Sequence, residues 1–189
     1  MTKKAIGFMV VFIAFVMAVP VSAQGPAAGK KGQSPGALTD LEIHHITYMR
    51  QEEKLARDVY LTLYDVWEAP IFANISESEQ RHMVALEGLI IKYGLVDPVE
   101  DDTAGEFTNS IFTDLYIELV ERGALSYCDA LQVGIDIEVL DIHDIEYALY
   151  DADVVVEAKH VIRVFENLLA GSDNHLIAFT SQYEAAGCE

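Results

Sequence analysis

The sequence predicts an all-α fold: a four-helix bundle with one extra short helix, in which two up-down hairpins are joined by a crossover. Three observations support this prediction. From residue 38 onward the apolar residues recur with helical spacing, and the continuous alternation typical of β-strands is absent. Caps and helix breakers delimit four long stretches and one short one. Hydrophobic residues make up 51% and charged residues 23% of the chain, which argues against a disordered polypeptide.

The first residues of the chain have the pattern of an export signal. Lys3 and Lys4 precede an uncharged apolar run, and small residues follow the run up to Ala23. Residues 1–23 are therefore expected to be a secretory signal peptide that is cleaved after Ala23. An uncleaved membrane anchor is the alternative, because residues 5–23 approach the length of a bilayer span.

Residues 24–37 are rich in Gly, Pro, Ala and Lys, so we expect a flexible linker between the signal and a helical domain at 38–189. The protein is then expected to be exported: secreted, periplasmic or associated with the cell envelope. No second apolar stretch of comparable length follows, so no membrane association is expected after cleavage.

Acidic residues dominate the charge of the chain. The formal net charge is -19, and loss of Lys3 and Lys4 with the signal leaves 10 basic against 31 acidic residues, about -21. Such a chain repels phosphate, which excludes nucleic acid as a partner and disfavours anionic membrane surfaces. It attracts cations instead.

Each predicted helix is delimited by residues that cap or break helices. A capping box opens the first helix, a proline marks the turn after it, glycines end the second and the short helix, and polar side chains can cap the last two. In chain order these residues are Thr39 with Glu42, Pro70, Gly94, Gly123, Ser126 and Asp153. The expected helices span 40–66, a start between 71 and 76 through 93, 110–122, 127–150 and 154–184.

Cys128 and Cys188 are the two cysteines of the chain. An exported protein meets oxidising conditions, in which a bridge between them would stabilise the fold by roughly 4 kcal/mol on the chain-entropy model. Cys188 is next to last, however, where chains are often poorly ordered. The sequence leaves the bridge open.

Polar residues on the apolar stripes of the long helices are informative, because burying an isolated charge is costly. Every long helix carries at least one carboxylate or imidazole on its inner face. These residues are Glu53, Glu79, His82, Glu138, Asp141 and His175. Carboxylates can bridge two ions and neutralise their charge, and one imidazole per ion adds a neutral ligand. The set therefore predicts a site for two ions of iron or manganese inside the bundle.

The spacing Glu-x-x-His occurs three times, and position in the bundle must choose among the three pairs. Glu79 and His82 lie near the middle of their helix among apolar residues, so this pair is the best candidate for a metal. The other two pairs lie in the first turns of helices, near the bundle ends, where a solvated face is the better interpretation. They are Glu42 with His45 and Glu157 with His160.

Three segments of the chain resemble a known family. They are Arg50-Gln-Glu-Glu-Lys-Leu-Ala-Arg-Asp-Val-Tyr60, Ser78-Glu-Gln-Arg-His82-Met and Gly171-Ser-Asp-Asn-His175-Leu. Together they look like the ferritin-like family catalogued as domain of unknown function 2202, over about residues 38–183. More remotely the chain is similar to rubrerythrins and ferritins, whose bundles hold a di-iron site. The resemblance implies a ferritin-like bundle, ligand positions for the six residues above, and Tyr60 as a tyrosine beside the metals.

One position departs from that pattern. Ser172 stands where the resemblance implies a bridging glutamate, and serine is a poor ligand for iron. Either a second ion is held weakly, or Asp141 or Glu166 compensates. Glu166 would need a π-bulge near Gly171 to share the face of the last histidine. The chain has no Cys-x-x-Cys pair, so the rubredoxin-type centre of rubrerythrins is not expected.

The expected function is that of a di-iron or related oxidoreductase, which oxidises Fe(II) or reduces oxygen or peroxide. Each Fe(II) would give up one electron, and Tyr60 would hydrogen-bond or supply an electron. A non-catalytic, secreted metal-binding or structural bundle is the alternative. A third reading is a metal-free bundle whose inner acids pair with Arg57, Arg81 or Arg163. A homodimer is left open.

Overall fold

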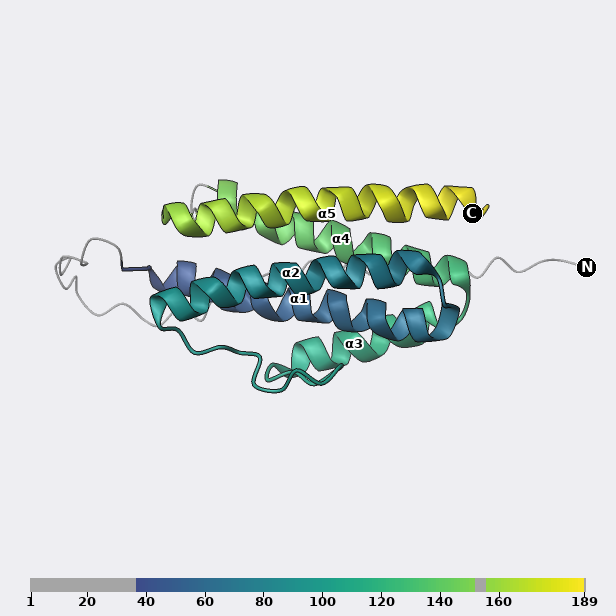
Figure 1. The fold of residues 1–189 in the computed structure, drawn as a ribbon, viewed down its shortest axis with the longest axis horizontal. Helices are drawn as coiled ribbons and strands as arrows, with labels where there is room; N and C mark the ends of the chain where they lie inside the picture. Colours follow the sequence, from purple (N-terminus) through teal and green to yellow (C-terminus); the bar gives the residue numbers. More distant parts are fainter. Residues whose placement is uncertain (1–36, 152–155, 189) are drawn as a thin grey trace, which may run out of the picture. The chain divides into compact units, whose positions relative to one another are not determined.

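The computed structural model describes residues 37–151 and 156–188, and all regular structure in these ranges is helical (Figure 1). The prediction of an all-α bundle is confirmed. The predicted signal peptide, 1–23, and all but the last residue of the predicted linker lie outside the described residues. The helices are α1 (Asp40–Trp67), α2 (Pro70–Tyr93), α3 (Ser110–Gly123), α4 (Tyr127–Tyr150) and α5 (Lys159–Ala185). In the described ranges, none of these helices combines the length and apolar character needed to cross a membrane.

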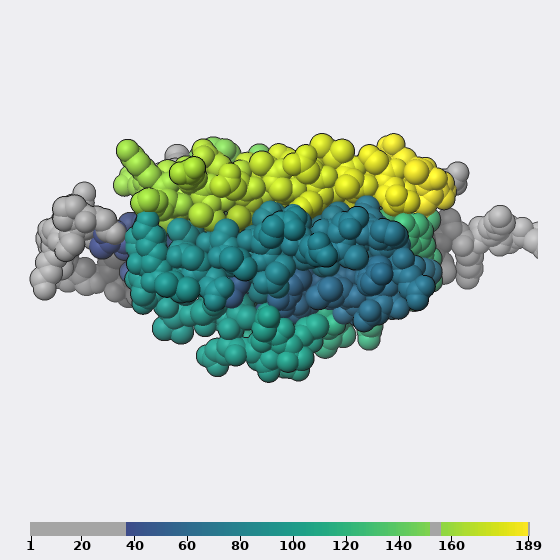
Figure 2. All heavy atoms as spheres, viewed as in Figure 1, coloured from purple at the N-terminus to yellow at the C-terminus, as the bar shows by residue number. Residues whose placement is uncertain are grey.

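The four long helices form two antiparallel hairpins that pack side by side (Figure 1). Helix α1 packs against α2 and α4, and α5 packs against α4 and α2. The end of α1 lies beside the start of α4, where the rings of Trp67 and Tyr127 are 6.0 Å apart. The short helix α3 packs on the outside of α1 and α4. Figure 2 shows the face on which α2 and α5 lie against each other.

Most of the predicted capping residues work as expected. Thr39 and Glu42 form the capping box, in which Glu42 N donates to Thr39 Oγ1 at 3.1 Å and Thr39 N donates to Glu42 Oε2 at 2.8 Å. Gly94 ends α2 in the left-handed conformation, with φ of 66°. Ser126 caps α4 by accepting from Asp129 N at 3.0 Å.

Helix α5 begins at Lys159, five residues later than predicted, and Asp153 lies outside the described residues. The residue before α5, Ala158, has no side-chain cap. Glu42 of α1 supplies the cap from another helix, because its Oε1 accepts from Glu157 N at 3.0 Å and from Ala158 N at 2.7 Å. A cap that comes from another element cannot be found in local sequence.

This cap also corrects the interpretation of one of the two Glu-x-x-His pairs that were predicted to be solvated. Glu42 is only 4% exposed, and His45 is buried with it, so the solvated-face prediction for this pair is wrong. The reason is that Glu42 bonds to the backbone of Glu157 and Ala158 just before α5, while Tyr147 of α4 packs beside the ring of His45. Glu157 and His160, in contrast, are exposed as predicted.

The apolar core consists of two clusters placed one after the other along the bundle. One surrounds Tyr60, Phe72 and Phe179. The other includes Met49, Leu86 and Phe165. On each long helix the inward polar residues stand between its contributions to the two clusters, so the polar centre is flanked by dry apolar layers.

The two cysteines form the disulfide that the sequence left open. Cys128, at the start of α4, is bonded to Cys188, which follows α5, with 5.5 Å between the Cα atoms. The bridge attaches the end of the chain to the bundle.

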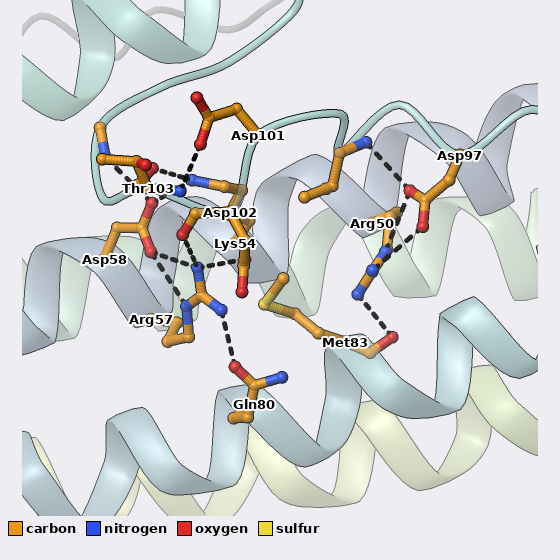
Figure 3. A network of polar contacts seen from close by, with 12 residues as sticks. Arg50, Lys54, Arg57, Asp58, Gln80, Met83, Asp97, Asp101, Asp102 and Thr103 are labelled. Atoms are coloured by element: carbon orange, nitrogen blue, oxygen red, sulfur yellow. Dashed lines mark hydrogen bonds and ion pairs between the residues drawn. The ribbon is translucent and has the colours of Figure 1, made fainter.

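A network of charges fastens loop 94–109 to α1 (Figure 3). Arg50 donates through Nη2 to Asp97 at 3.1 Å. Lys54 donates to the carbonyl of Thr103 at 2.8 Å and is almost completely buried. The loop is therefore attached to the bundle by hydrogen-bonded charges that sit on one side of α1.

Candidate metal centre

The structure brings the six predicted ligand residues together in the interior. Glu53 comes from α1, Glu79 and His82 from α2, Glu138 and Asp141 from α4, and His175 from α5. Five of them are buried, and His82 is nearly so, with 11% of its side chain exposed. Five of the six also form two groups whose ligand atoms all lie within 4.8 Å of one another. These groups, which we call the two triads, are Glu53, Glu79 and His82, and Glu79, Glu138 and His175.

Glu79 belongs to both triads, and each of its oxygens faces a different imidazole. Its Oε2 is 2.9 Å from His82 Nδ1, and its Oε1 is 2.8 Å from His175 Nδ1. The second approach is a close ion contact without hydrogen-bond geometry. A carboxylate placed in this way can give one oxygen to each of two cations.

The outer member of each triad completes the pattern. His82 Nδ1 is 3.0 Å from Glu53 Oε2, and His175 Nδ1 is 3.4 Å from Glu138 Oε2. The two imidazoles stack with ring centroids 5.5 Å apart. Both rings thus direct the same nitrogen, Nδ1, at carboxylates, so both nitrogens are available as ligands once they lose their protons.

Tyr60 lies beside the second triad, as the resemblance implied. Its hydroxyl donates to Glu138 Oε1 at 2.6 Å. The ring is fully buried and packs against Phe179 at 5.1 Å and Phe72 at 6.4 Å between centroids. The tyrosine is therefore fixed in position and touches one carboxylate of the centre.

Asp141 lies outside both triads. Its Oδ2 accepts a hydrogen bond from Ser172 Oγ, so the serine that replaces the expected glutamate positions this carboxylate. Oδ1 has no hydrogen-bond partner among the described residues. Glu166 is exposed and α5 runs without a break past Gly171, so the reserve candidate does not reach the centre.

The inner acids are not paired with arginines, contrary to the third hypothesis. Arg57 bonds to Asp58 at 2.7 Å and to Asp102 at 2.8 Å rather than to a residue of the triads. Arg81 and Arg163 are exposed. The basic neighbours of the inner acids are therefore imidazoles rather than arginines.

Burial and the mutual proximity of the acids shift the pKa values of the centre. Burial and the neighbouring carboxylates raise the pKa of Glu53 well above its usual range, that of Glu138 to about 8 and that of Asp141 to about 7. Burial alone would lower the pKa of His82, but Glu53 and Glu79 outweigh it and raise the value to about 11. Protons on these groups compensate the charge, and metal ions could replace them.

Several buried atoms of the centre lack hydrogen-bond partners within the described part of the chain. They are Glu53 Oε1, Glu79 Oε1, Asp141 Oδ1 and His175 Nδ1. Buried polar atoms are nearly always satisfied in folded proteins, so a cluster of unsatisfied ones indicates that a further group binds here. Carboxylate oxygens with one imidazole per triad fit iron or manganese.

Sequence reasoning missed the role of Gly171. A Cβ atom at this position would lie 2.4 Å from His82 Nε2, so only glycine leaves room for the imidazole. The glycine next to a Ser-x-x-His motif was the available signal, but the sequence does not say which ring packs on it.

The chain matches a sequence family and two solved structures. Residues 42–189 match the family described as "Uncharacterized protein domain (DUF2202)". Over 142 residues, 75% of each protein, the chain is 49% identical to the uncharacterized protein MJ0754 of Methanocaldococcus jannaschii. The crystal structure of hypothetical protein MJ0754 from Methanococcus jannaschii superposes with a TM-score of 0.77 and 43% identity, over 86% of this chain and 89% of that one. A DUF305 fragment from Deinococcus radiodurans, with a TM-score of 0.55 and 14% identity over 79% of this chain and 99% of that one, shares the fold alone.

Proposed function

The chain belongs to the DUF2202 family, and we propose that this member is an exported two-metal oxidoreductase that oxidises Fe(II) or reduces oxygen or peroxide. The observation that carries the proposal is Glu79, whose two oxygens face His82 and His175 within 3 Å. One carboxylate between two imidazoles is the arrangement expected for a ligand that two ions share. The disulfide supports the proposed export.

The residues of the two triads would hold the ions. Glu53 and His82 would bind one, Glu138 and His175 the other, and Glu79 both, with iron or manganese as the metal. When bound, such ions supply one-electron redox chemistry and a binding position for oxygen or peroxide. The proposed oxidase or peroxidase activity requires at least one coordination position on the ions that no protein ligand occupies, so that oxygen or peroxide can bind there.

The protein's own groups would handle protons and exclude water. His82 and His175, whose pKa values are raised to about 11 and about 9 by Glu53, Glu79 and Glu138 against the opposing effect of burial, would release protons as the metal binds. The Tyr60 hydroxyl donates to Glu138 and can keep this carboxylate oriented. The apolar clusters on both sides keep bulk water away.

The test is metal content followed by turnover. We expect the purified protein to bind about two iron ions per chain and to oxidise added Fe(II) rapidly under oxygen or peroxide. The double variant Glu79→Gln, His82→Gln should lose the metal and the activity. The matched control is Glu157→Gln, His160→Gln, which removes the same motif at an exposed place. Unchanged metal content in the Glu79 variant would refute the assignment of the site.

The second candidate function is metal binding without turnover, and Ser172 is the observation in its favour. The hydroxyl bonds to Asp141 rather than providing a second shared carboxylate, so Glu79 alone would link the two ions. A protein that binds iron but leaves the rate of Fe(II) oxidation at that of the buffer would support this alternative.

A further inference from the structure

A cavity lies where the seam between α2 and α5 (Figure 2) reaches the start of α2. It has a volume of about 430 Å³ and is partly open to solvent, and this volume is in the range of small-molecule sites. Its wall includes Asn74 and Ile75 of α2, Tyr127 of α4, and Ala178 and Gln182 of α5. None of these residues belongs to the two triads, so the cavity is a separate feature of the bundle.

The lining of this cavity is uncharged, although the chain carries a net charge of -19. Asn74 and Gln182 are exposed and Tyr127 is half-buried, and their amides and phenol can donate and accept hydrogen bonds. Ile75, which is buried, and Ala178 offer apolar surface. The lining has no carboxylate to hold a cation and no basic group to hold an anion. The cavity therefore suits an uncharged molecule that combines a hydrogen-bonding group with a small apolar one.

The two helices place both sides of the cavity at the same height along the seam. A Cβ atom at Gly171 would lie 2.4 Å from His82 Nε2, so these two residues face each other across α2 and α5. Seven residues, about two turns, separate His82 from Ile75 on α2 and Gly171 from Ala178 on α5. Because α2 and α5 run in opposite directions (Figure 1), Ile75 and Ala178 also lie at one height, and both line the cavity.

The buried wall of the cavity lies one helical turn from the second triad. Ile75 precedes Glu79 by four residues and Ala178 follows His175 by three, which is a rise of about 5 Å on each helix. Glu79 Oε1 and His175 Nδ1 are 2.8 Å apart, and neither has a hydrogen-bond partner in the described chain. The cavity therefore approaches the part of the centre whose polar atoms are unsatisfied.

We propose that this cavity, which we call the seam pocket, binds a small alkyl hydroperoxide, ROOH, next to the candidate metal centre. The hydroperoxide group bonds to the amides or the phenol of the lining, and the alkyl group packs on Ile75 and Ala178. The role of ROOH as oxidant rests on the proposed function. Its O–O bond breaks to give ROH and water, with two protons from solvent and two electrons from the oxidation of two Fe(II) to Fe(III). Molecular oxygen is apolar and makes no use of the amides.

The seam pocket is tested with the metal-free full chain, using tert-butyl hydroperoxide and its unreactive relative tert-butanol as probes. We expect both to bind in an NMR titration, and pivalate, which has the same alkyl group but carries a charge, to bind about tenfold more weakly or worse. Ala178→Phe fills the cavity and should weaken hydroperoxide binding by about tenfold or more. Gln182→Leu should also weaken it and serves as a second variant if Ala178→Phe folds poorly. Ala170→Phe adds the same ring at an exposed position of α5 and is the matched control.

Failure of the seam pocket and failure of the proposed function are distinguishable, because the binding experiment needs no metal. A chain that binds the probes but does not oxidise Fe(II) would retain the pocket and lose the proposed function. In active protein, Ala178→Phe should raise the KM for the hydroperoxide and leave bound metal at the wild-type number. The seam pocket is overturned if the metal-free chain binds neither probe, or if Ala178→Phe and Gln182→Leu both keep wild-type affinity. It is also overturned if pivalate binds as tightly as tert-butanol.

Discussion

Helix α1 carries two buried groups of charges on different sides, and they are neutralised in different ways. Lys54 belongs to the network that holds loop 94–109 (Figure 3), while its neighbour Glu53 belongs to the candidate metal centre. The loop network matches three cations with three anions, namely Arg50, Lys54, Arg57, Asp58, Asp97 and Asp102. The centre instead places three carboxylates against two imidazoles, with a fourth, Asp141, nearby.

This difference indicates that the charges of the loop network stabilise the fold, whereas the charges of the centre are arranged to bind a ligand. In the loop network every charge has a partner supplied by the chain, so the network is complete without any ligand. In the centre several oxygens have no partner among the described residues, and protons must make up the missing positive charge. Breaking the first group should therefore cost stability, while changing the second should alter what the protein binds.

The largest effect is expected from breaking the loop network at Asp58. This side chain is completely buried and accepts from Lys54, Arg57 and the backbone of Gly105. Asp58→Ala should lower the free energy of unfolding by about 3–5 kcal/mol, because it removes the buried carboxylate that the buried cations Lys54 and Arg57 share. Urea unfolding monitored by circular dichroism measures this loss.

A variant at an exposed position of the same network serves as the control for Asp58→Ala. Asp102 also bonds to Arg57, at 2.8 Å, but its side chain is 66% exposed. Asp102→Ala should cost no more than about 1 kcal/mol, as is typical of solvated ion pairs. Equal losses in the two variants would show that the network is not held by its buried charges.

The second prediction concerns pH and the metal-free centre. The pKa of Glu138 is raised to about 8 from its ordinary 4.5, and that of Asp141 to about 7 from 3.8, by burial and then by neighbouring groups including Glu79. A raised pKa means that the fold favours the protonated acid. This contribution is complete below the ordinary value and is lost as the pH rises through the raised one. Metal-free protein should therefore lose stability as the pH rises from 5 to 8.

Denaturant unfolding at several pH values in the presence of a chelator measures this slope. His82, with a pKa raised from its ordinary 6.5 to about 11, adds to this loss above about pH 6.5, and its contribution continues to fall up to about pH 11. Glu138→Gln removes one of the two acids and should flatten the curve between pH 5 and 8. Saturating Mn²⁺ should reverse the slope, because protons compete with the metal for the same ligands. Stability of the metal-free protein that rises over this range would contradict the proposed proton compensation.

The third prediction tests how the bundle positions His82. Gly171→Ala places a Cβ atom 2.4 Å from the imidazole and must displace it from the first triad. We expect metal affinity to fall by about 10–100-fold, as for the loss of residues that orient metal ligands. The matched control is Gly88→Ala in the middle of α2, where an added Cβ meets nothing within 4 Å. That control should keep wild-type affinity, so a similar loss in both variants would remove the positioning role of Gly171.

The sequence was sufficient for residues whose neighbours are fixed by helical periodicity. Helix bounds are correct to within a few residues for four of the five helices, and the six proposed ligands lie together because each occupies the inner stripe of its helix. It was insufficient where a partner comes from a distant part of the chain. The cap that Glu42 gives to α5, the bonding of Ser172 to Asp141 and the burial of Glu52 depend on how helices are placed against each other, which no local pattern records.

The smallest effect is expected at Tyr60, which connects the candidate metal centre to the apolar cluster that contains Phe72 and Phe179. Tyr60→Phe removes one hydroxyl, which donates to Glu138 at 2.6 Å, and preserves the packing of the ring against Phe72 and Phe179. We expect a loss of stability of about 1 kcal/mol and little change in bound metal, because the phenol belongs to neither triad. If Tyr60 also serves the proposed reaction, the rate of Fe(II) oxidation should fall much more than the metal content. A rate that falls only in proportion to the metal content would restrict Tyr60 to holding Glu138 in place.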